Sequence, residues 1–141
     1  MQIVPMDEKN LYEVYEIEKN CFSDPWKIDI FKDQLQQNYS YCFVAYVGGQ
    51  VAGYVMMWCF GDEGEIINIA TDPNYRRQGV AKELLAACKK ICKKITLEVR
   101  LSNVAAIHLY EKHGFKNMGT RKDYYKNPTE DAVIMILGLE D

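Results

Sequence analysis

The sequence lacks the features that would place the protein in a membrane, on nucleic acid or outside the cell. No run of about 18 apolar residues occurs in the 141-residue chain, so no membrane-spanning helix is predicted. Residues 1–7 contain no basic segment followed by an apolar stretch, which predicts no leader peptide. The 17 Lys and Arg against 20 Asp and Glu give a net charge of −3, which argues against a general nucleic-acid binder. We therefore expect a cytoplasmic protein that contacts neither membrane nor nucleic acid.

Internal repeats, linkers rich in proline or serine and low-complexity stretches are also missing from the sequence. The chain is 48% hydrophobic and 26% charged, which is enough apolar material for a buried core. The sequence therefore predicts a single domain over residues 1–141.

The cysteines do not form a recognisable framework, because they are odd in number and scattered. Their positions are 21, 42, 59, 88 and 92. Most have apolar neighbours, which favours reduced thiols in the core. Cys88 and Cys92 lie one helical turn apart and could bind a metal ion with His108 or His113. Structural zinc sites usually show closer paired spacing, so we predict no metal site.

The order of apolar patterns predicts an α+β fold with a mixed sheet. Strands are expected at 2–5, 41–47, 50–60, 65–71, 95–99, 115–123 and 132–139, and helices at 7–21, 27–36, 78–92 and 103–113. Asp7 is a candidate cap for the first helix. Gly48 and Gly49 suit a tight hairpin turn. The succession of strand 65–71, helix 78–92 and strand 95–99 is a crossover unit, so its two strands are expected to be parallel.

The stretch Arg-Arg-Gln-Gly-Val-Ala at 76–81 lies between a predicted strand and a predicted helix. The first N–H groups of a helix lack partners and carry the positive end of its dipole, so they can hold a pyrophosphate while the arginines add charge. The stretch is neither a Walker loop nor a three-glycine dinucleotide motif. The alternative is a basic loop with a glycine turn.

Two further features suggest chemistry near the end of strand 95–99. Asn103 and Tyr110 are seven residues apart, about 10.5 Å along nearly the same side of a helix, which suits a slender ligand. Tyr110 could instead lie at the domain edge. Glu98 is a carboxylate among apolar neighbours, and burial would raise its pKa and make it a better base. The alternative for Glu98 is a surface residue or a structural ion-pair partner.

The run INIATDPNYRRQGVAKELL closely resembles the cofactor motif of the GNAT acetyltransferase superfamily, with Arg76, Gly79 and Ala81 at its key places. The resemblance implies the GNAT fold: a mostly antiparallel sheet with splayed parallel central strands, flanked by helices. It also implies acetyl-CoA as co-substrate and a bulge on the preceding strand at 69–71. The implied cofactor-binding residues are Ile69, Ala70, Thr71, Arg76, Arg77, Gln78, Gly79, Val80, Ala81, Lys82 and Asn103.

Three separated stretches resemble, within that superfamily, the RimI-type ribosomal-protein-alanine N-acetyltransferases. They are LEVRLSNVAAIHLYEKHGF at 97–115, FSDPW at 22–26 and DYYKNPTEDAVIM at 123–135. The resemblance implies that Glu98 accepts a proton and that Tyr110 donates one. It also makes Phe22, Trp26, Tyr124 and Tyr125 candidates for lining the peptide path.

The predicted function is acetyl transfer to the N-terminal alanine of the eighteenth small-subunit ribosomal protein, so the predicted partner is a protein N-terminus. A role in a partner assembly stays open, although no segment identifies a docking surface, and so do two alternatives for the activity itself. One is an acetyltransferase of the same fold that acts on a small amine or on lysine. The other is a non-catalytic acyl-CoA-binding domain, which would have no need to keep both Glu98 and Tyr110.

Overall fold

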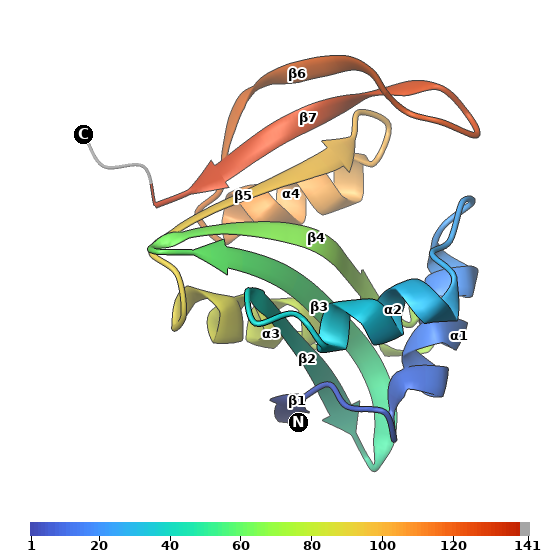
Figure 1. The fold of residues 1–141 in the computed structure, drawn as a ribbon. Helices are drawn as coiled ribbons and strands as arrows, with labels where there is room; N and C mark the ends of the chain where they lie inside the picture. The colour runs from blue at the N-terminus through green and yellow to red at the C-terminus, as the bar shows by residue number, and fades with distance from the viewer. Residues whose placement is uncertain (139–141) are drawn as a thin grey trace.

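The computed structural model describes residues 1–138 as seven strands and four α-helices with one short 3₁₀ helix (Figure 1). The strands are β1 (Gln2–Pro5), β2 (Ser40–Val47), β3 (Gln50–Phe60), β4 (Glu63–Thr71), β5 (Lys94–Arg100), β6 (Lys116–Tyr125) and β7 (Glu130–Leu137). The helices are α1 (Leu11–Cys21), α2 (Ile28–Leu35), the 3₁₀ helix η1 (Pro73–Tyr75), α3 (Val80–Lys89) and α4 (Val104–Lys112). None of these helices is long and apolar enough to cross a membrane.

The strands form one sheet in the order β1-β2-β3-β4-β5-β7-β6, in which β4 and β5 are the parallel pair and the other neighbours are antiparallel. The parallel ladder has only three residue pairs, from Glu63↔Lys94 to Glu65↔Thr96. Beyond them the two strands separate, as Figure 1 shows where β4 and β5 meet at one end and diverge toward the other. The predicted mixed sheet with splayed parallel strands is confirmed.

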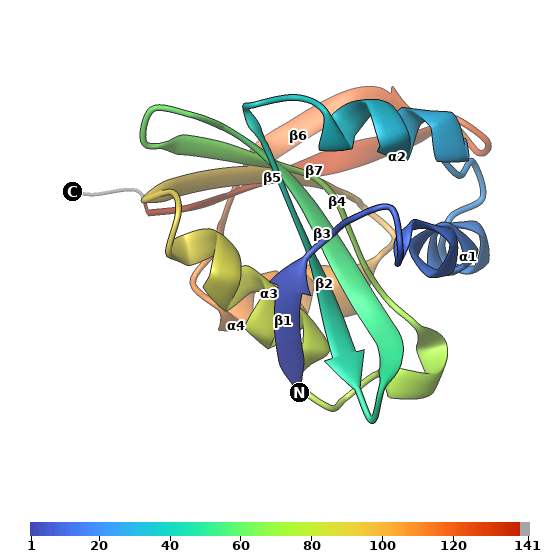
Figure 2. The same ribbon diagram turned by 60° about the horizontal axis from the view of Figure 1, so that its bottom comes forward.

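The helices cover the two faces of this sheet in pairs (Figure 2). Helices α1 and α2 bury Val14, Ile17 and Phe31 in a core cluster on one face. Helices α3 and α4 bury Leu84 and Tyr110 in a second cluster on the other face. Both faces of the central strands are therefore packed, which explains why β3 reads as an almost continuous apolar run.

A bulge in β4 changes which face its side chains meet. Met57 pairs with Ile66 and Met56 with Asn68, so Ile67 is the extra residue on β4. Ile66 belongs to the core cluster under α3 and α4, whereas Ala70 belongs to the cluster under α1 and α2. The bulge expected at 69–71 thus lies earlier, at Ile67, because that is where the pairing register with β3 shifts.

Most predicted elements are confirmed, but all four helices begin later than predicted, α2 and α4 by one residue and α1 and α3 by more. Helix α1 begins at Leu11, because the Asp7 carboxylate accepts hydrogen bonds from the backbone N–H groups of Lys9 and Asn10 and closes a turn before the helix. Asp7 is therefore not the helix cap. Helix α3 begins at Val80 after Gly79, whose φ of 81° is left-handed, and it ends at Lys89. The predicted end of the last strand, residue 139, lies outside the described residues.

The expectation of five reduced cysteines is wrong for two of them. Cys59, near the end of β3, and Cys92, after α3, form a disulfide across 33 residues of sequence. The crossover through α3 brings the chain back beside the end of β3, a meeting that local sequence patterns do not encode. Cys42 and Cys88 are free and buried, and Cys21 is free and half-buried.

Candidate active site

A cavity of about 720 Å³ opens where β4 and β5 diverge. Its walls come from the end of α1 and the loop after it, from β4 and β5, from the residues before α4 and Tyr110 within it, and from the end of β6 and the β6–β7 turn. Side chains far apart in the sequence therefore face one space. The lining includes Glu18, Phe22, Trp26, Asn68, Ile69, Glu98, Asn103, Tyr110, Tyr124 and Tyr125.

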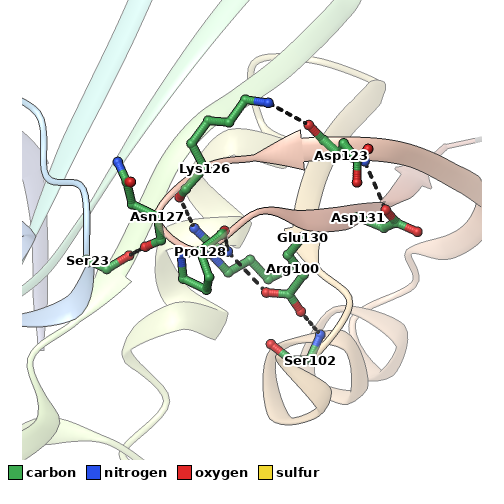
Figure 3. Close-up of polar contacts among 9 residues, drawn as sticks. All are labelled: Ser23, Arg100, Ser102, Asp123, Lys126, Asn127, Pro128, Glu130 and Asp131. Atoms are coloured by element: carbon green, nitrogen blue, oxygen red, sulfur yellow. Dashed lines mark hydrogen bonds and ion pairs between the residues drawn. The ribbon is translucent and has the colours of Figure 1, made fainter.

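Two chain segments meet across one side of this cavity (Figure 3). The Ser23 hydroxyl, in the loop after α1, donates a hydrogen bond of 2.8 Å to the backbone carbonyl of Asn127 in the β6–β7 turn. This contact spans 104 residues of sequence. It joins the two segments, FSDPW and DYYKNPTEDAVIM, that carry part of the family resemblance.

Arg100, at the end of β5, holds the β6–β7 turn in place (Figure 3). Its guanidinium donates to the backbone carbonyls of Lys126 and Pro128 at 2.8 and 2.9 Å. It also pairs with the Glu130 carboxylate at 3.1 Å, and that carboxylate accepts a hydrogen bond from the Ser102 backbone N–H. Arg100 thus fixes both the turn and the approach to α4.

Glu98 is a nearly buried carboxylate that faces the cavity from β5. Its side chain is 9% exposed. Burial and the nearby Glu65 carboxylate raise its pKa above the ordinary value, whereas the Arg121 guanidinium, 3.5 Å from Glu98 Oε1, acts in the lowering direction. The raised pKa confirms the predicted direction.

Tyr110 reaches the same cavity from α4. Its side chain is 7% exposed, and its ring packs against Phe115 with the centroids 5.8 Å apart. Burial raises its pKa well above the ordinary value, which keeps the phenol protonated at neutral pH. The structure therefore places a carboxylate of raised pKa and a neutral phenol around one space.

Asn103 lies at the cavity edge and has a local task as well. Its side-chain oxygen accepts a hydrogen bond of 3.1 Å from the Ala106 backbone N–H and so caps α4. The side-chain amide N–H groups are not used by this cap. These N–H groups can therefore donate to a ligand that lies along the helix.

The basic loop at 76–82 does not line this cavity. It follows β4 through η1 and leads into α3. Arg77 and Gly79 both have left-handed backbones, with φ of 65° and 81°, and residues 76–79 are exposed. A Cβ added at Gly79 would meet nothing within 4 Å, so the glycine serves the backbone conformation and not close packing. No side chain caps the start of α3, and the first N–H groups of a helix have no partner within it, an arrangement that fits a pyrophosphate.

A family model described as the acetyltransferase (GNAT) family matches residues 11–115. The chain belongs to this GNAT acetyltransferase family. Full-length relatives agree with the match. The chain is 39% identical over 133 residues to a Bacillus subtilis protein that is provisionally named a ribosomal protein bS18-alanine N-acetyltransferase. That alignment covers 90% of this chain and 88% of the relative.

Two comparisons with Escherichia coli support the same assignment. The chain is 34% identical to the ribosomal protein bS18-alanine N-acetyltransferase of strain K12 over 142 residues, covering 96% of this chain and 95% of the relative. The crystal structure of the ribosomal-protein-S18-alanine N-acetyltransferase from Escherichia coli superimposes with a TM-score of 0.87, covering 96% of this chain and 92% of that one. The protein is thus an acetyl-CoA-dependent N-acetyltransferase with the GNAT fold.

The GNAT fold brings together only part of the predicted site. Glu98, Tyr110, Asn103 and Ile69 line the cavity, as do the four candidate aromatic residues of the peptide path. The loop at 76–82 lies apart from the cavity, at the start of α3. No group of three or more His, Cys, Asp or Glu side chains within residues 1–138 is arranged to hold a metal ion.

Several residues of this GNAT site were missed by sequence reasoning. Arg100 and Glu130 lie inside the motifs that carry the resemblance, but nothing local shows that they bind each other across 30 residues. Glu18 lies in α1 among the core-facing positions, and helical spacing alone does not distinguish it from an apolar residue there. The available signal was a charged residue at a position where the pattern calls for an apolar one.

We expect Arg121→Gln to raise the pKa of Glu98 further, because the substitution removes the cation and leaves burial and Glu65 in place. The effect is moderated by solvent, since the Arg121 side chain is 56% exposed. Titration of ¹³C-labelled glutamate carboxyls by NMR measures it. Lys116→Gln removes an exposed cation elsewhere on β6 and is the matched control. An unchanged Glu98 titration in Arg121→Gln would show that the ion pair has no influence.

Proposed function

We propose that this enzyme transfers the acetyl group of acetyl-CoA to the α-amino group of a protein N-terminus, and that its acceptor is the N-terminal alanine of ribosomal protein bS18. The observation that carries the proposal is the presence of Glu98 and Tyr110 around one cavity at the divergence of β4 and β5. The full-length similarity to relatives named for this reaction supports the acceptor. A cytoplasmic location, where ribosomal proteins are made, agrees with the proposal.

Glu98 acts as the base. An α-amino group has an ordinary pKa of about 7.7 to 8.0, so it is mostly protonated at neutral pH and cannot attack a carbonyl carbon in that form. The Glu98 carboxylate, directly or through one water molecule, takes this proton. Its raised pKa brings it nearer to neutral and makes it a stronger base than an exposed glutamate.

The free edge of β4 binds the thioester. From Ile66 onward β4 has no ladder partner on its β5 side, so those backbone N–H groups between Ile69 and Thr71 that point away from β3 remain available there. Their N–H groups polarise the thioester carbonyl and stabilise the negative charge that forms on its oxygen. Acetyl-CoA supplies the activated acetyl group in this arrangement.

The cofactor loop and α4 hold the rest of the co-substrate. The residues from Arg76 to Lys82 bind the pyrophosphate through the N–H groups at the start of α3 and through the arginine charges. The Asn103 amide contacts the pantetheine arm where α4 borders the cavity. Each of these tasks falls to residues of the chain, and we propose no resident metal ion.

Tyr110 acts as the acid. As the acceptor nitrogen bonds to the carbonyl carbon and the carbon–sulfur bond breaks, the Tyr110 hydroxyl gives its proton to the departing thiolate. Glu98 keeps the proton that it took from the ammonium group, and the second proton, which the nitrogen loses on becoming an amide, passes to the Tyr110 phenolate and restores the phenol. The acetyl group passes directly between the two substrates, so the reaction needs no acetylated cysteine.

We expect Glu98→Gln to keep acetyl-CoA binding and to lower turnover at neutral pH by about 10²- to 10⁴-fold, the usual effect of removing a general base. The loss should shrink as the pH rises, because the acceptor amine then deprotonates without help. Steady-state rates over a pH series check this, together with calorimetric acetyl-CoA binding. A variant with the wild-type rate at neutral pH would falsify the assignment of Glu98.

Tyr110→Phe should lower turnover by about 10²-fold, because only the proton-donating hydroxyl is lost. The ring stays in the core beside Phe115, so the melting temperature is expected to change little. The matched control is Tyr12→Phe, at a tyrosine that is 65% exposed. If Tyr110→Phe is as active as this control, the role of Tyr110 is packing.

The acceptor is tested with peptides that differ in their first residue: Ala, Ser, Gly, Met and Trp. The amine must come within about 3 to 3.5 Å of the thioester carbon, so a small first residue is expected to react fastest and tryptophan slowest. Mass spectrometry locates the added acetyl group. A matched peptide with a blocked N-terminus and free lysines should not react. Equal rates for the blocked and free peptides would move the acceptor to lysine.

A further inference from the structure

Glu18 is a buried carboxylate on the core-facing side of α1 and is only 1% exposed. Its neighbours on that side, Leu11, Val14 and Ile17, are apolar. Placing a carboxylate there costs free energy that an apolar residue would not, and burial raises the pKa of Glu18. The proposed acetyl transfer gives Glu18 no role.

Three hydrogen-bond donors surround this carboxylate, and each comes from a different segment of the chain. The Tyr54 hydroxyl of β3 donates to Oε1. The Asn68 side-chain amide of β4 donates to the same oxygen at 2.6 Å. The backbone N–H of Trp26, in the loop after α1, donates to Oε2 at 2.9 Å. Three donors favour the ionised carboxylate, and they tie α1, the loop, β3 and β4 together.

The bond to Asn68 acts on the part of β4 that has lost its neighbour. Asn68 directly follows the bulge residue Ile67, and the bulge turns Asn68 and Ala70 toward the α1 side of the sheet. Past this point β4 pairs only with β3. A second contact from α1, between the Cys21 thiol and the Thr71 carbonyl at 3.5 Å, reaches the end of the same segment. Helix α1 therefore holds a segment of β4 that pairs with β3 along one edge and has no ladder partner along the edge that faces β5.

We propose that Glu18 and Asn68 are positioning residues for acetyl transfer, and that their hydrogen bond fixes the free edge of β4 at the place where the thioester binds. The proposal rests on the proposed function for the assignment of the thioester to that edge. A buried carboxylate is suited to this task because it accepts several directed hydrogen bonds at once, which an apolar side chain cannot do.

The test exchanges the two groups across the hydrogen bond. Asn68→Asp places two carboxylates together, so we expect acetyl-CoA affinity and turnover to fall by about 10²-fold, the effect of a small misplacement. Adding Glu18→Gln should restore both to within about threefold, because the new amide at position 18 donates to the new carboxylate at position 68. Its carbonyl oxygen still accepts from Trp26, and the Tyr54 hydroxyl turns to accept. Asn38→Asp, at an exposed asparagine, controls for the charge change.

A purely structural role is distinguished by Asn68→Ala and Tyr54→Phe. Both remove one donor to Glu18, but only Asn68→Ala releases β4, so it alone should weaken acetyl-CoA binding while the KM for the peptide stays near the wild-type value. Tyr54→Phe should lower the melting temperature and leave acetyl-CoA affinity unchanged. These two variants also decide the matter if Asn68→Asp does not fold.

The proposal is overturned if the double exchange binds acetyl-CoA no better than Asn68→Asp, or if Asn68→Ala and Tyr54→Phe change acetyl-CoA affinity equally. Calorimetric binding of acetyl-CoA separates this outcome from a failure of the proposed function. An enzyme that binds acetyl-CoA but acetylates no peptide N-terminus contradicts the proposed acceptor, and the binding constants of the variants still decide the role of Glu18.

Discussion

The separation of β4 from β5 after three paired residues is the constraint on which the rest of the site depends. Parallel strands that stayed paired would satisfy each other's backbone groups and leave no space between them. Their divergence opens the cavity and leaves one edge of β4 without a ladder partner. It also sets Glu98 beside that opening, on a strand whose other edge is still held by β7.

An open fork in a sheet has to be supported from outside the sheet, and the molecule does so on both sides. On the β4 side, the bulge at Ile67 turns Asn68 toward Glu18 of α1. On the β5 side, Arg100 binds the β6–β7 turn, and that turn meets the loop after α1 at Ser23. Helix α1 and its loop therefore contact both sides of the fork.

Electrostatics distinguishes the two buried carboxylates of this cavity. Glu18 is almost fully buried, and its carboxylate accepts hydrogen bonds from three donors that belong to the loop after α1, to β3 and to β4. Glu98 has an exposed arginine and a neighbouring glutamate as its charged surroundings, and its side chain lines the cavity. The two glutamates therefore meet different surroundings, which agrees with the positioning role proposed for Glu18 and the proton-transfer role proposed for Glu98.

The sequence by itself determined the succession of strands and helices, the crossover that makes β4 and β5 parallel, and the candidates Glu98 and Tyr110. The elements follow from periodicity and turn residues, because local spacing decides which side of an element a residue occupies, whereas the roles expected of Glu98 and Tyr110 follow from the resemblance of their motif to a known family. The loop at 76–82 was also predictable, because a glycine directly before a helix indicates a backbone turn that other residues rarely adopt.

Only the tertiary structure decided which distant groups meet. The partners of Glu18 at Tyr54 and Asn68 lie 36 and 50 residues away, and the Cys59–Cys92 disulfide spans 33. The position of the bulge depends on the register between β3 and β4, which no single segment encodes. Such contacts arise when packed layers bring strand ends and loops together. The role of a buried carboxylate in a helix can therefore be inferred only when its hydrogen-bond donors, which come from distant segments, are known.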